Sequence, residues 1–101
     1  MHSRRQKPVR IVERSLLASL AARKMKAEML AMVWGNRILL HNTSREEFLN
    51  DRAWVQHELC HVEQFRKHGF LPFLIKYTWE TLRKGYHNNK FEVEARAAEK
   101  A

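Results

Sequence analysis

The chain has 101 residues, enough for one domain with a single modest core, and this length excludes a two-lobed enzyme with a deep cleft between lobes. An apolar fraction of 45% indicates a folded protein, and a net charge of +8 would suit an acidic partner, a nucleic acid or a membrane surface. Because the basic residues are not interleaved with aromatic or glycine motifs, nucleic-acid binding is an alternative that we do not favour.

The N-terminal part of the chain is basic. Residues 1–10 include Arg4, Arg5, Lys7 and Arg10, and we expect them to form a flexible basic arm that precedes a single domain of residues 11–101. Apolar residues then recur at helical spacing from residue 12 to about residue 26, which predicts a first helix. The apolar positions of this helix are Leu16, Leu17, Leu20 and Met25.

A β-hairpin is predicted after this helix. Residues 29–34 and 37–41 are short apolar runs, and the Gly35-Asn36 pair between them is a turn dipeptide. A hairpin alone is marginally stable in water, so it must pack on the helices. We expect its second strand to offer an edge on which an extended peptide substrate could pair.

A long helix should follow the hairpin. The segment Ser44-Arg45-Glu46-Glu47 has the spacing of a capping box, and it predicts a helix from about Arg45 to His68. Gly69 supplies the residue that ends it.

Two further helices complete the predicted fold. Pro72 suits the first turn of a helix that ends at Gly85, and Asn89 can cap a last helix from about Lys90. The fold class is therefore α+β and mostly helical. The tryptophans expected in the core are Trp34, Trp54 and Trp79.

Two features bear on the location of the protein. No apolar run in the sequence is long enough to span a bilayer, so we expect no transmembrane segment. Cys60 is the one cysteine, which rules out an intrachain disulfide. A reducing, cytoplasmic compartment is the simplest interpretation.

The most informative motif is His57-Glu58-Leu59-Cys60-His61, which spells H-E-x-x-H inside the predicted long helix. Residues four apart share one face of a helix, so His57 and His61 can direct two imidazole nitrogens at one metal ion. Glu58 can then reach a water on that metal and accept its proton, as in zinc peptidases. The alternative is a pair of surface histidines on an amphipathic helix.

A catalytic zinc site needs a third protein ligand, with the fourth position left for water. Glu92 and Glu94 open the last predicted helix, and because they are two residues apart they cannot both face one ion. We favour Glu92, since the small Ala95 follows on its side and permits a close approach to the motif helix. Glu94 stays the alternative ligand, and Glu92 could instead form a capping box with Asn89.

Two segments carry a resemblance to a known family. Residues 57–64 (H-E-L-C-H-V-E-Q) and 85–95 (G-Y-H-N-N-K-F-E-V-E-A) resemble small bacterial proteins of the zincin type that are similar to the gluzincins. The resemblance covers residues 28–98 and implies a minimal metallopeptidase core of a helix, an edge hairpin, the motif helix and a ligand helix. In related membrane-linked metallopeptidases the third ligand opens an E-x-x-A-D pattern. Residues 92–95 match its first four positions, which favours Glu92, whereas Arg96 replaces the acidic residue.

Our hypothesis from the sequence is therefore a zinc-dependent metallopeptidase that acts on a peptide or protein substrate, with Glu58 as general base. The expected ligands of Zn²⁺ are His57, His61 and Glu92. A donor for the developing oxyanion is also expected. The candidates for this donor are Tyr77, Tyr86 and His87. The alternatives are a zinc-binding protein without catalysis and a small basic module that binds nucleic acid or a protein partner.

Overall fold

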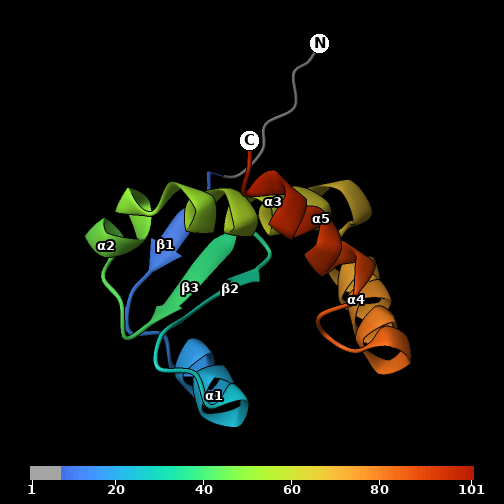
Figure 1. Cartoon of the computed structure of the whole chain (residues 1–101), viewed down its shortest axis with the longest axis horizontal. Helices are drawn as coiled ribbons and strands as arrows, with labels where there is room; N and C mark the ends of the chain where they lie inside the picture. The colour runs from blue at the N-terminus through green and yellow to red at the C-terminus, as the bar shows by residue number, and fades with distance from the viewer. Residues whose placement is uncertain (1–7) are drawn as a thin grey trace.

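The computed structural model describes residues 8–101, which form five helices and a three-stranded sheet (Figure 1). The elements in chain order are β1 (Arg10–Val12), α1 (Leu16–Met25), β2 (Leu30–Trp34), β3 (Arg37–His41), α2 (Arg45–Asn50), α3 (Arg52–His68), α4 (Phe70–Lys84) and α5 (Lys90–Ala98). This arrangement confirms the α+β, mostly helical class. Of the predicted basic arm, residues 1–7 lie outside the described residues, and Arg10 opens β1.

The sheet has the order β1-β3-β2, with β3 in the centre. The predicted hairpin is confirmed: β2 and β3 pair antiparallel with Met32 opposite Leu39, and Gly35 adopts φ 70° in the turn. β1 pairs in parallel with β3, with Ile11 opposite Ile38. The second strand of the hairpin is therefore paired on both sides, and our expectation that it offers an edge is wrong. Within residues 8–101, the free edge on the hairpin side belongs to β2.

Helices cover both faces of the sheet. Leu39 of β3 packs with Ala18 and Ala22 of α1 on one face. Its neighbours Ile38 and Leu40 point to the opposite face, where they join the main core. That core also contains Phe48, Val62, Phe65, Phe73 and Phe91, contributed by α2, α3, α4 and α5.

The first helix begins later than its periodicity suggests and presents a different face to the sheet. Ser15 caps α1 by accepting a hydrogen bond from the amide of Ala18, 3.2 Å away. Ala18 and Ala22 are fully buried against the sheet, so the helix packs closely. Leu16 and Leu20 lie on the outer side and are 74% and 53% exposed. The apolar spacing thus identified the helix but not its buried face.

The predicted capping box is confirmed, but the helix after it is short. The Ser44 hydroxyl accepts from the amide of Glu47 and the Glu47 carboxylate accepts from the amide of Ser44, both at 3.0 Å. α2 then ends at Asn50, because Asp51 is extended (φ −101°, ψ 92°) and its side chain caps α3 by accepting from the amide of Trp54. The predicted helix of residues 45–68 is therefore two helices.

The last two helices agree with the sequence, whereas the placement of the tryptophans agrees only in part. Gly85 has φ 84° and ends α4, and Asn89 caps α5. Trp54 packs edge-on against Phe48 in the core. Trp34 and Trp79 are 38% and 59% exposed, so their expected places in the core are wrong; α4 buries the side opposite Trp79. Among the described helices, none combines the length and the apolar character needed to cross a bilayer.

Candidate metal centre

Two helices bring three metal-binding side chains to one point. His57 and His61 come from α3 and Glu92 from the first turn of α5, and their ligand atoms all lie within 4.8 Å of one another. Nε2 of His57 lies 3.1 Å from Oε1 of Glu92, and Nε2 of His61 lies 3.1 Å from Oε2. Ala95 of α5 is fully buried, as expected for close packing of the two helices. The predicted trio is close enough to bind a metal ion.

The structure places Glu92, and not Glu94, in this cluster. The Glu94 carboxylate instead accepts a hydrogen bond from Nε2 of Gln64 at 2.7 Å. Asn89 caps α5 by accepting from the amide of Phe91, and in the described segment no capping box joins it to Glu92. Both oxygens of Glu92 are therefore available to the histidines.

Nδ1 of each imidazole, the nitrogen that points away from Glu92, also makes a hydrogen bond. Nδ1 of His57 donates to Oε2 of Glu99 at 2.7 Å, and Nδ1 of His61 donates to Oε1 of Gln64 at 2.8 Å. Gln64 is fixed in turn because its Nε2 donates to the carbonyl of Phe91. A proton on Nδ1 leaves the lone pair of Nε2 for a metal, and such outer partners orient the ligands of known metal sites.

The sequence places Glu99 on the same side of the last helix as Glu92, but sequence reasoning assigned neither Glu99 nor Gln64 a role as an outer partner. Gln64 follows His61 by three residues, so it lies on the same side of α3. Glu99 follows Glu92 by seven residues, or two helical turns, so it returns to the same side of α5. They supply the outer carboxylate and amide contacts, whereas Arg96 donates to the carbonyl of His87.

Glu58 lies beside the cluster and is 5% exposed. Burial raises the pKa of its carboxyl to about 7, against the opposing effect of the two nearby imidazoles. No side chain or amide among the described residues hydrogen-bonds to this carboxylate. A buried carboxylate with a pKa near neutrality, beside a metal-binding cluster, has the properties of a general base.

The charges of the cluster depend on one another. The hydrogen bond to Glu92 raises the pKa of His57 to about 9. Burial would lower the pKa of His61, but Glu92 outweighs this effect and raises it. Burial would raise the pKa of Glu92, but hydrogen bonds from both imidazoles hold it well below its usual range. Metal binding would therefore have to displace protons from the imidazoles.

The three candidate oxyanion donors occupy different positions. The Tyr77 hydroxyl donates to Oε2 of Glu92, so it supports a ligand. Tyr86 lines the cavity next to the cluster, and burial raises the pKa of its hydroxyl, which keeps the proton available for donation. His87 is exposed and does not line that cavity. Tyr86 is therefore the candidate best placed to act as a donor.

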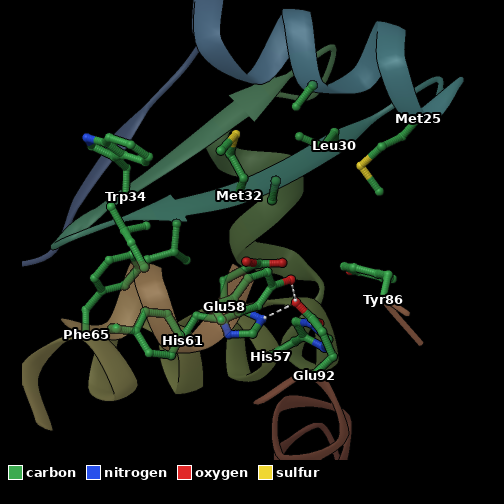
Figure 2. Close-up of a pocket in the computed structure, with 16 residues that line it drawn as sticks. Met25, Leu30, Met32, Trp34, His57, Glu58, His61, Phe65, Tyr86 and Glu92 are labelled. Carbon is green, nitrogen blue, oxygen red and sulfur yellow. Dashed lines mark hydrogen bonds and ion pairs between the residues drawn. The ribbon is translucent and has the colours of Figure 1, made fainter. Parts of the chain in front are cut away.

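A cavity of about 340 Å³ separates the cluster from the sheet (Figure 2). All five residues of β2 line it, because the free edge of this strand faces the cavity. Figure 2 shows His57, Glu58, His61 and Glu92 gathered on the side opposite β2. The remaining walls are mostly apolar and come from α1, α3, α4 and Tyr86. The cavity can hold a small ligand or a segment of extended chain between the strand and the cluster.

This arrangement joins three ligand atoms, a carboxylate that can accept a proton, and an adjoining cavity. No family model, curated protein or solved structure matches the chain. An evolutionary relationship to the zincins is therefore a proposal. It is supported by the motifs at residues 57–64 and 92–95 and by the closeness of His57, His61 and Glu92.

Proposed function

We propose that this protein is a zinc-dependent metallopeptidase of the zincin type, with His57, His61 and Glu92 as the metal ligands. One observation carries the proposal: Nε2 of each histidine faces the same carboxylate, while each Nδ1 is held by a separate hydrogen bond. Two imidazoles and one carboxylate form a donor set of catalytic zinc sites, which leave a fourth position for water. A structural zinc site would instead have four protein ligands.

Glu58 moves the proton in this mechanism. Zinc held by His57, His61 and Glu92 would supply a water of lowered pKa and would polarise the carbonyl of the scissile peptide bond. Glu58 accepts a proton from that water as the water oxygen bonds to the carbonyl carbon. Glu58 then gives the proton to the amide nitrogen as the C–N bond breaks, which yields a carboxyl group and an amine. In the metal-free protein, burial raises the pKa of Glu58 to about 7, which favours acceptance of a proton by this carboxyl.

Tyr86 acts as the donor to the carbonyl oxygen while negative charge develops on it. Tyr86 lines the cavity beside the cluster, and burial raises the pKa of its hydroxyl, so the hydroxyl keeps its proton at neutral pH. Tyr77 has a different role, because its hydroxyl already donates to Glu92 and fixes the orientation of that ligand.

The free edge of β2 provides the place for an extended substrate. A peptide that pairs with this strand would gain backbone hydrogen bonds and would lie across the cavity from the metal ligands. Met25, Met32 and Leu74 line the same cavity, so substrate side chains that enter it should be apolar. The substrate class is therefore an extended, apolar peptide segment.

Cleavage of a peptide mixture tests this proposal. Zinc-loaded protein is incubated with unstructured peptides, and new termini are identified by mass spectrometry. We expect cleavage beside apolar residues, and we expect Glu58→Gln to abolish it while bound zinc, measured by elemental analysis, is retained. Glu63→Gln is the matched control, because Glu63 lies on the same helix with an exposed side chain paired to Arg66.

The outcomes separate the alternatives. Full activity in Glu58→Gln would refute the proposed mechanism. Zinc bound without cleavage of any peptide would indicate a zinc-binding protein without catalysis. No zinc bound, together with salt-sensitive binding of DNA or RNA, would favour a nucleic-acid-binding module.

A further inference from the structure

α4 carries a stripe of large apolar side chains on its outer side. The stripe consists of Leu71, Ile75, Trp79 and Leu82, which are 63%, 65%, 59% and 76% exposed. Spacings of four, four and three residues place them on one side of the helix. Phe73 and Tyr77 pack toward the core from the other side. The stripe is therefore available to a partner. It is a continuous apolar surface, whereas the apolar residues normally exposed on a protein are scattered singly.

The exposed charged side chains beside this stripe are all basic. Glu80 is the only acidic residue in the sequence of α4, and it is buried, where it accepts from the amide of Lys90 at 3.0 Å. Lys76 and Arg83 are exposed and lie next to the stripe around the helix. The outer surface of α4 thus combines apolar and basic side chains without an exposed carboxylate.

α1 repeats this combination. Leu16 and Leu20 are 74% and 53% exposed, Arg23 and Lys24 follow in the last turn, and the helix sequence contains no acidic residue. Figure 1 shows α1 and α4 extending to the same side of the molecule in this view. The net charge of the whole chain is +8, so a long-range attraction acts in the same direction as these local charges.

We propose that the outer face of α4 binds an anionic membrane surface, with the helix lying in the plane of the interface. An interfacial helix combines large apolar residues on one side with Lys and Arg beside them, and tryptophan is enriched at the lipid headgroup level. A second copy of the chain would bring basic residues against basic residues. A nucleic acid would meet the charges but would leave the apolar stripe exposed to water. An anionic bilayer satisfies both features.

Vesicle partitioning tests this inference independently of any catalysis. The full chain is sedimented with vesicles of phosphatidylcholine, with and without about one third phosphatidylglycerol. We expect binding to the anionic vesicles that falls as salt is raised. Ile75→Ser/Trp79→Ser should lower the partition coefficient at least about tenfold. Lys76→Gln/Arg83→Gln should lower it by about fivefold per residue.

The control is Leu49→Ser/Val93→Ser, which removes two apolar residues that are 46% and 48% exposed on α2 and α5. This control should bind like the wild type. Brominated lipids should quench the tryptophan fluorescence of the wild type and should quench Trp79→Phe less, although that variant keeps the stripe apolar.

Three outcomes would overturn the proposal. One is no binding to anionic vesicles. A second is binding that Ile75→Ser/Trp79→Ser leaves unchanged, since this would assign the attraction to charge elsewhere in the chain. The third is a dimer in sedimentation velocity that the same double substitution dissociates while vesicles are not bound, which would assign the stripe to a second copy of the chain.

Discussion

Glu99 accepts a hydrogen bond from Nδ1 of His57 at 2.7 Å, from the C-cap position of α5, seven residues beyond Glu92. Nε2 of the same ring lies 3.1 Å from Glu92. Helix α5 therefore holds both nitrogens of one imidazole, and its orientation fixes the ring as well as the third ligand. The cluster depends on the register between α3 and α5 and not on the H-E-x-x-H motif alone.

Loss of the Glu99 carboxylate should weaken metal binding without removing a ligand. We expect Glu99→Ala to lower zinc affinity by about 10- to 100-fold, because the His57 ring loses the acceptor that orients it and sets its tautomer. Competition with a chromogenic chelator measures the change. Glu63→Ala, an exposed position on α3, should bind zinc like the wild type. Equal affinities for the two variants would show that Glu99 has no influence on the site.

Metal content distinguishes the proposed third ligand from its neighbour. Protein purified without an affinity-tag metal should contain about one zinc per chain. His61→Ala and Glu92→Ala should lose this zinc, since each variant leaves two ligands. Glu94→Ala and His68→Ala should retain it, because neither side chain belongs to the cluster. Zinc retained in Glu92→Ala would mean that the third ligand has been assigned incorrectly.

The stability that this cluster contributes should fall with rising pH in the metal-free protein and should not fall in the zinc-bound protein. The raised pKa of His57 makes a contribution that is fully present below the unfolded value of 6.5 and is lost as the pH rises through about 9. The lowered pKa of Glu92 makes a contribution that is present above its unfolded value of 4.5 and is lost as the pH falls below that value. In metal-free protein, raising the pH from about 6.5 to about 9 should therefore weaken this cluster.

Zinc should remove that loss, because it takes the place of the ring protons on the imidazoles. At constant free zinc, the rise in Tm on adding the metal should grow between about pH 6 and about pH 9. Differential scanning calorimetry at several pH values measures this rise. A rise in Tm that is the same at every pH would show that the metal binds without displacing protons from His57 or His61.

Two tyrosines of the site should respond differently to loss of the hydroxyl. Tyr86→Phe should lower kcat by about 10²- to 10³-fold with little change in zinc affinity, because it removes a donor to the developing oxyanion. Tyr77→Phe should instead lower zinc affinity, because its hydroxyl supports Glu92. Steady-state kinetics and chelator competition on both variants separate the two roles. The assignment fails if Tyr86→Phe loses zinc and keeps its kcat.

The parts of the fold that local patterns specify could be predicted from the sequence. The Gly35-Asn36 turn, the Ser44–Glu47 capping box and the end of α4 at Gly85 each depend on a few adjacent residues. β1 could not be predicted, because its three residues pair with a strand 27 positions further along the chain. A short-range sequence pattern does not indicate which distant strand will pair in parallel. The break at Asp51 was missed because residues 45–68 show continuous helical spacing.

The candidate site divides in the same way. His57, Glu58 and His61 follow from the motif and the geometry of one helix. Glu92 could be favoured over Glu94 only through a packing argument, since the choice depends on how α5 rotates against α3. The buried side of α1 was unpredictable for a related reason: tertiary packing selected its alanines, although its leucines have the larger apolar surface.

The separation of Glu92 from His57 by 35 residues has a consequence for synthesis of the chain. The two histidines leave the ribosome before the third ligand, so the nascent polypeptide has no complete zinc site while the sheet and α3 are being made. The three side chains that could hold a metal ion come together only when α5 docks on α3. The order of translation therefore places assembly of the metal-binding cluster after synthesis of the sheet and α3.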